Sequence, residues 1–240
     1  MRTLQIACLL VFTSSLFSAP DPATLLQEAD RARGGHLPGL TWELDILSRD
    51  GEEQEQHSLF LQSHLRNTRV EYTAPAKSKG QLVLMRDRNM WFSRPGLQKP
   101  VPISPRQRLS GQASNGDIAS TDYSGDYAAT LASEETIAGD RCAVLDLTAK
   151  SKNTTYDRIR YWVSIDRKVG VKADFLTVSG KRFKSATFEY NNRIHFEGRS
   201  YPFVSRMVIT DAINPAAVSV LSYRDVRVKK LNPVIFESVQ

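Results

Sequence analysis

The hydrophobic and polar positions along the chain follow two different periods. Between Pro22 and Ala32 the apolar residues recur at three- and four-residue spacing, which is typical of one face of a helix. Asp21 is a favourable N-cap, Pro22 suits the first helical position, and the pair Gly34-Gly35 is a stop signal. The pattern therefore predicts one helix at the start of the mature chain.

From Leu40 onward the period changes to 2, which is typical of strands. Leu40, Trp42, Leu44 and Ile46 alternate with polar residues. The turn signals Asp50-Gly51 and Asp87-Arg88-Asn89 each predict a hairpin. Further segments with strand character are residues 56–63, 67–72, 82–85, 90–93, 101–104, 141–148, 156–166, 171–178, 183–191, 201–210, 218–228 and 233–239.

Residues 106–132 interrupt the alternation. Residues 111–117 form a polar loop, and residues 121–132 are predicted to be helical, with Tyr123, Tyr127 and Leu131 on one side. The whole pattern gives ten to twelve strands with one or two helices. Alternating strands joined by short turns favour an antiparallel sheet with one apolar face, and so many strands must curl or close. A sandwich is the alternative, but the two helices favour a curved sheet with helices laid into its mouth.

Residues 1–19 have the layout of a secretory signal peptide. Arg2 supplies the positive start, residues 4–17 are largely apolar, and Ser18-Ala19 are small. The apolar run is too short and interrupted for a membrane span, although a permanent N-terminal anchor is the alternative. We expect residues 20–240 to form one exported, periplasmic domain, with the cut after either Ser18 or Ala19.

Charge and cysteine content narrow the function classes. The net charge of +6 is spread along the chain, without the dense patch or motif that nucleic-acid binding requires. A mild positive charge fits either transient contact with anionic lipid headgroups or solubility alone. Without the leader, Cys142 is the single cysteine, and its alternating segment predicts a small buried side chain rather than a reactive thiol.

Motifs for catalysis are missing from the sequence. Neither a G-x-S-x-G elbow nor an H-E-x-x-H motif occurs, and the glycine-rich segment 111–117 lacks the lysine of a phosphate loop. Asn115, Asp117, Asp122 and Asp126 could bind a hard cation, but they do not follow the EF-hand pattern. We expect no enzymatic activity, no metal and no cofactor. A hydrolase or isomerase would require clustered His, Asp and Ser side chains inside the fold.

Between Tyr72 and Leu131 the segments 75–80, 90–92 and 110–117 follow one another as a turn, a Trp-bearing strand and a polar loop, and this order resembles that of the outer-membrane lipoprotein-sorting proteins of the LolA-like superfamily. A P-x-x-x-K-G turn at residues 75–80 precedes a strand bearing Trp91, and a Gly/Ser/Asp-rich loop at residues 110–117 precedes the tyrosine-containing segment. The later run Arg160-Tyr161-Trp162-Val163 also looks like this family, so the resemblance covers nearly all of the mature chain.

The resemblance implies an incomplete antiparallel β-barrel, lidded by helices, that encloses a hydrophobic cavity. It also implies a periplasmic carrier that binds the acyl chains of a lipid or lipoprotein for sorting toward the outer membrane. A carrier of this kind needs a dry apolar concavity, and it would act as a monomer. The candidate lining residues are Trp42, Leu44, Ile46, Leu82, Leu84, Trp91, Phe175, Phe188, Met207, Ile209, Leu221 and Tyr223.

Each of these side chains could instead simply fill a closed core. Tyr123, Tyr127 and Leu131 are candidates for a lid, with Gly116 and Gly125 beside it as hinges, and a rigid plug is the alternative. The alternative function is an accessory or sensor module of an envelope exporter of the resistance–nodulation–division type, or of a stress system, without bulk lipid transport.

Overall fold

The computed structural model describes residues 21–119 and 121–237, so the predicted leader at residues 1–19 lies outside the described residues. The first helix, α1 (Pro22–Arg31), forms where the sequence predicts it. The Asp21 carboxylate accepts a hydrogen bond from the Thr24 backbone N–H at 2.9 Å, which caps the helix. The apolar stripe of α1 is buried, including Leu25, Leu26 and Ala29.

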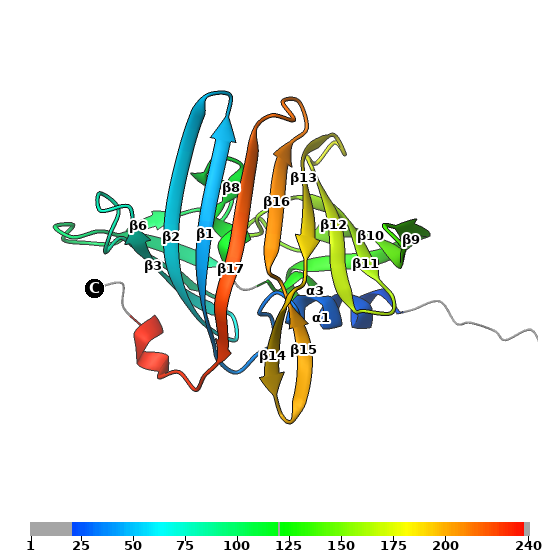
Figure 1. Ribbon diagram of the computed structural model, residues 1–240, viewed down its shortest axis with the longest axis horizontal. Helices are drawn as coiled ribbons and strands as arrows, with labels where there is room; N and C mark the ends of the chain where they lie inside the picture. Colours follow the sequence, from blue (N-terminus) through cyan, green and yellow to red (C-terminus); the bar gives the residue numbers. More distant parts are fainter. Residues whose placement is uncertain (1–20, 120, 238–240) are drawn as a thin grey trace, which may run out of the picture.

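One antiparallel sheet of thirteen strands dominates the described residues (Figure 1). Its strands, in spatial order, are β6 (Val101–Ile103), β5 (Asn89–Ser93), β4 (Leu82–Arg86), β3 (Asn67–Ala74), β2 (Glu53–His64), β1 (Leu40–Asp50), β17 (Val218–Val228), β16 (Arg206–Asp211), β13 (Arg182–Glu189), β12 (Val169–Leu176), β11 (Arg158–Ser164), β10 (Asp140–Ala149) and β9 (Tyr127–Ile137).

The chain fills this sheet from the middle outward and then from the far edge back. It starts at β1, steps outward to the edge strand β6, crosses to the opposite edge strand β9, and returns through β17 to pair with β1. The two edges are not paired with each other, so the sheet is curved but open. The prediction of a mainly β fold with an incomplete barrel is confirmed, and a sandwich of two packed sheets is not formed.

The crossing segment forms an insert on one side of the sheet. It contains the short hairpin β7 (Arg108–Ser110) and β8 (Ala113–Ser114), followed by α2 (Asn115–Ile118) and α3 (Tyr123–Asp126). Figure 1 shows β8, α1 and α3 behind the sheet, on its concave face. The helix α1 contacts α3 as well as β9, β11 and β12.

The expected helix at residues 121–132 is wrong beyond Asp126. Residues from Tyr127 to Ile137 form the edge strand β9, which pairs with β10 along its length. Positions four residues apart, such as Tyr127 and Leu131, share one face in a helix and in a strand alike. The tyrosine and leucine spacing therefore could not distinguish the two structures.

Two other expected strands also differ. Residues 233–239 were expected to be a strand, but Pro233–Phe236 form a 3₁₀ helix, η1. Pro233 has no N–H for a ladder, and the Asn232 side chain accepts a hydrogen bond from Val234 N at 3.1 Å, which starts the turn. The expected strand 201–210 is divided between β16 and a separate hairpin of β14 (Asn192–Phe196) and β15 (Arg199–Phe203), which projects from one end in Figure 1.

The two faces of the sheet carry different apolar clusters. The large main cluster unites the concave face with α1 and the insert. On the convex face, Leu84 packs with Leu231 and Phe236, so η1 covers that part of the sheet. Cys142 packs on the same face with Val144 and Trp162, and is fully buried as the sequence predicts. None of the helices in the described part of the chain is both long and apolar enough to cross a membrane.

Candidate functional site: the interior of the curved sheet

The concave interior brings together nine of the twelve residues that were predicted to line a cavity. All nine belong to the main cluster, and none is more than 6 % exposed. They come from β1, β12, β13, β16 and β17 and are Trp42, Leu44, Ile46, Phe175, Phe188, Met207, Ile209, Leu221 and Tyr223.

Leu82, Leu84 and Trp91 do not share this interior. They pack around η1 in the convex cluster. In β4 it is Val83 and Met85 that belong to the main cluster. Neighbouring residues of a strand point to opposite faces, so Leu82 and Leu84 face outward when Val83 and Met85 face the interior.

The three predicted lid residues close the same interior. Tyr123 and Tyr127 belong to the main cluster, and Leu131 is half-buried and packs against it. The Tyr123 ring meets the rings of Tyr127 and Tyr161 edge-on, with centroid distances of 5.3 and 5.5 Å. Tyr123 thus connects α3 to the side of the concave face formed by β9 and β11.

This interior is closed in the structure. Five of the hollows around the described residues have volumes between about 160 and about 610 Å³, and none of these five is lined by any of the twelve predicted residues. The hollow of about 590 Å³ lies beside α3 and is lined by residues that include His36, Leu65 and Arg66. A cargo could therefore reach the interior only if α3 or its neighbours moved.

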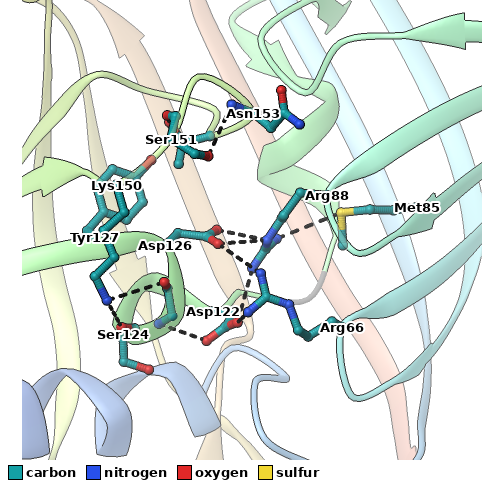
Figure 2. Close-up of polar contacts among 12 residues, drawn as sticks. Arg66, Met85, Arg88, Asp122, Ser124, Asp126, Tyr127, Lys150, Ser151 and Asn153 are labelled. Carbon is teal, nitrogen blue, oxygen red and sulfur yellow. Dashed lines mark hydrogen bonds and ion pairs between the residues drawn. The ribbon is translucent and has the colours of Figure 1, made fainter.

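Ion pairs hold α3 against two turns of the sheet (Figure 2). Arg66, in the β2–β3 turn, lies 2.9 Å from Asp122, and Arg88, in the β4–β5 turn, lies 2.9 Å from Asp126. Arg88 and Asp126 are at most 13 % exposed, so water screens their pair weakly, whereas the Arg66 side chain is 45 % exposed and its pair with Asp122 is screened more. We refer to Arg66, Arg88, Asp122 and Asp126 as the α3 latch.

The opposite side of α3 is fixed by the strand β10. Lys150 donates from Nζ to the carbonyl oxygens of Ser124 and Gly125 at 2.9 and 3.3 Å, and its backbone N–H donates to Asp126 (Figure 2). The short helix is therefore held by side chains from both the β2–β5 side and the β9–β10 side of the sheet.

A cluster of His, Asp and Ser side chains lies where α1 meets α3. His36 Nε2 is 3.0 Å from Ser124 Oγ, 3.7 Å from Asp30 and 3.5 Å from Asp122. A catalytic triad needs the serine and the carboxylate on different ring nitrogens, whereas here all three groups approach the same nitrogen. This arrangement ties two helices together and does not form a proton relay.

Charge explains how this cluster is stabilised. Asp30 is buried, and burial raises the pKa of its carboxyl group. The hydrogen bond to Asp30 raises the pKa of His36, so a protonated imidazole offsets the buried carboxylate. The donor atoms of Asp30, His36 and Asp122 lie within 4.8 Å of one another, as in a metal site. However, the Asp122 carboxylate already pairs with the Arg66 guanidinium group, so it is engaged with a cation from the protein itself.

A second polar network anchors the insert near α2. Tyr156 donates to both oxygens of Asp117, at 2.9 and 2.7 Å, and Asp117 also accepts from the Ser114 N–H that begins α2. Lys184 donates from Nζ to Gln112 O, Ser114 Oγ and Tyr156 Oη at 2.8 to 3.3 Å. All three hydrogens of the ammonium are used, so Lys184 is a structural cation, although burial lowers its pKa.

A buried arginine that the sequence pattern did not predict, Arg33, lies against the main cluster. It is 5 % exposed, and its guanidinium carbon lies 4.8 Å from the Phe188 ring centroid and 5.3 Å from that of Tyr123. Arg33 lies in the turn that follows α1, just beyond the C-cap Ala32, so the helical spacing of α1 does not reveal that its side chain faces the interior.

Known proteins share this architecture. A LolA superfamily protein of Nitrosomonas europaea is 31 % identical, with a TM-score of 0.81 over 92 % of this chain and 99 % of that one. An outer membrane lipoprotein-sorting protein domain from Vibrio parahaemolyticus is 18 % identical, with a TM-score of 0.76 over 90 % of this chain and 96 % of that one. A DUF1329 family protein from Desulfovibrio piger is 21 % identical, with a TM-score of 0.74 over 91 % and 98 %. The latter two likenesses concern the fold alone.

Comparison by sequence gives two further results. A family model described as an uncharacterized protein matches residues 65–240. No curated protein matches the chain. The identity and the almost complete coverage shared with the Nitrosomonas protein decide the assignment, and the chain belongs to the LolA superfamily.

Proposed function

We propose that this protein is a periplasmic carrier that binds acyl chains of a lipid or lipoprotein against the concave face of its sheet, for transport toward the outer membrane. The observation that carries the proposal is an open sheet whose apolar concave face is closed by one short insert and the α3 latch. The proposed binding surface comprises the nine predicted residues of the main cluster, and Tyr123, Tyr127 and Leu131 form the proposed lid.

The energetics of acyl-chain burial support this proposal. Burial of one methylene group is worth about 0.8 kcal/mol, so a chain of roughly fifteen methylenes offers on the order of 10 kcal/mol before ordering costs. Displacement of α3 costs the latch contacts and exposes Tyr123 and Tyr127. A cargo of that size repays several such contacts, whereas a small solute does not.

The proposed role requires no chemistry, because a carrier only binds and releases its cargo. His36 and Lys184 are both engaged in contacts with neighbouring groups, His36 with Ser124 and Lys184 with the Gln112 carbonyl oxygen. A transient encounter with a membrane surface would load or unload the cargo. A partner protein, such as an exporter, would act at that same step.

The direct test is native mass spectrometry of the exported protein, combined with uptake of N-phenyl-1-naphthylamine, a neutral fluorescent probe of apolar sites. We expect co-purified lipid and saturable probe uptake. A protein that carries no lipid and takes up no probe would contradict the carrier proposal. A tightly co-purifying protein partner, without lipid, would instead favour the accessory or sensor role.

A further inference from the structure

The interior of the sheet holds a positive charge that no described residue compensates. Arg33 is 5 % exposed and forms no ion pair with any carboxylate in residues 21–119 and 121–237. Its Nη1 has no hydrogen-bond partner, and Nη2 has only the Met207 sulfur at 3.9 Å. An arginine stays protonated in a protein, so the charge persists.

The groups around Arg33 soften this charge but do not cancel it. The rings of Tyr123 and Phe188 provide cation–π contacts. Tyr161, Tyr190 and Tyr223 also lie close enough to interact electrostatically with the guanidinium group. Burial raises the pKa of Tyr223 to about 12, so this hydroxyl stays neutral and supplies no counter-charge. A buried cation without an anion is costly, and an apolar side chain would fill the space more favourably.

A second unused donor lies in the same cluster. Trp42 is 1 % exposed, and its indole Nε1 has no hydrogen-bond partner. The Trp42 ring packs against Phe203, which in turn packs against Tyr223, with centroid distances of 6.3 and 6.4 Å. Arginine and tryptophan side chains can only donate hydrogen bonds. The tyrosine hydroxyls around Arg33 are neutral acceptors, so what the interior lacks is an oxygen-bearing anion to pair with the guanidinium group.

We propose that the cargo is an anionic amphiphile whose headgroup pairs with Arg33 inside the sheet while its acyl chain lies along the concave apolar face. This inference rests on the proposed carrier function and specifies its ligand class. A carboxylate matches the two-pronged guanidinium geometry, and a phosphate monoester shares the same chemistry. We expect α3 to move when the headgroup enters, because Arg33 is 5 % exposed and Tyr123 of α3 lies over its guanidinium group.

The test compares ligands that share a chain and differ in the headgroup. The exported protein is stripped of lipid and loaded with N-phenyl-1-naphthylamine, and palmitate, hexadecyl phosphate and hexadecanol then compete for the site. Hydrogen bonds to charged groups contribute about 1.5–3 kcal/mol, which corresponds to roughly ten- to 150-fold in affinity. We expect palmitate or hexadecyl phosphate to displace the probe at concentrations lower than hexadecanol by such a factor. The stronger of the two anions identifies the headgroup.

Variants separate a headgroup site from a merely structural cation. In Arg33→Met the preference for the anion over hexadecanol should disappear while probe uptake persists, and Arg33→Lys should keep part of the preference. Arg31→Met is the matched control, because Arg31 is the last residue of α1, two positions before Arg33, but packs on Tyr201 instead. It should retain the full preference.

The outcomes distinguish this inference from the carrier function. Equal displacement by hexadecanol and the two anions in the unmodified protein would overturn the role of Arg33 and leave the carrier intact. Unchanged preference in Arg33→Met would overturn it as well. Absence of any probe uptake by the unmodified protein would overturn both. The comparison of headgroups needs no variant, so it remains decisive even if Arg33→Met fails to fold.

Discussion

At the scale of single residues, the interior combines tight aromatic packing with buried charge. The rings of Tyr156 and Phe175 stack at a centroid distance of 3.9 Å, below the insert that Tyr156 anchors through Asp117. The same interior accommodates Arg33 without a counter-ion. Aromatic packing thus contributes stability, and part of that stability offsets the cost of the uncompensated cation.

Replacement of Phe175 tests the packing. Because Phe175 is fully buried, Phe175→Ala should lower the free energy of unfolding by about 3–5 kcal/mol through lost transfer energy and a residual cavity. Phe183 is half-buried beside the same tyrosine, so Phe183→Ala should cost roughly half as much. Denaturant titration measures both. Equal losses would mean that the interior at Phe175 is not packed as described.

His36 should make stability depend on pH. Asp30 and Asp122 favour its protonated form in the folded state, and Arg31 opposes it, with a net rise of the pKa above 6.5. A raised folded-state pKa gives a contribution that is fully present below pH 6.5 and is lost as the pH rises through the folded value. The melting temperature should therefore fall as the pH rises above about 6.5 and through the raised pKa of His36.

The variant His36→Gln should reduce this fall, because it removes the titrating group. His195→Gln is the control, since His195 is exposed on the β14–β15 hairpin and should leave the pH profile unchanged. If His36→Gln and the unmodified protein show the same slope, His36 does not supply the cation that holds α1 to α3.

At the scale of elements, the sequence predicts those helices and turns that depend on neighbouring residues along the chain. The capped helix α1 and the hairpin turns at residues 50–51 and 87–89 follow from turn and cap chemistry. The face of β4 does not, because Leu82 to Met85 are all apolar and show no alternation. The role of Arg33 depends on contacts with strands more than 150 residues away, and such tertiary contacts leave no mark in a local pattern.

Disruption of the α3 latch should increase the rate at which a ligand enters the interior. Arg88→Met removes the better buried of the two arginines and leaves Arg66 in place, so the closed position should lose roughly 1–3 kcal/mol. We expect faster uptake of N-phenyl-1-naphthylamine by a factor of about ten, measured by stopped-flow fluorescence.

A matched control removes an ion pair of similar length from the exterior. Arg160 and Asp146 lie 2.8 Å apart on β11 and β10 and are 48 % and 36 % exposed. Arg160→Met should leave the uptake rate unchanged, because exposed pairs contribute little. If both variants take up the probe at the original rate, movement of α3 does not limit entry.

At the scale of the whole molecule, the open sheet has a stable centre and two weaker sides. At the centre, the long strand β1 pairs with β2 on one side and with β17 on the other, whereas β6 and β9 are the edge strands. The insert connects the two sides through the α3 latch and Lys150. Cargo binding should therefore alter the edges and the insert while the central strands stay as they are.

Hydrogen exchange before and after loading with palmitate measures this difference directly. Amides of residues 121–131 should lose protection on loading, because α3 must leave the position in which Tyr123 covers Arg33. Amides of β1, β2 and β17 should keep theirs, because opening of the central strands requires global unfolding. A uniform gain of protection throughout the chain, residues 121–131 included, would mean that cargo is bound without displacement of α3. In that case the insert is a fixed plug, and the entry route must lie elsewhere along the rim of the sheet.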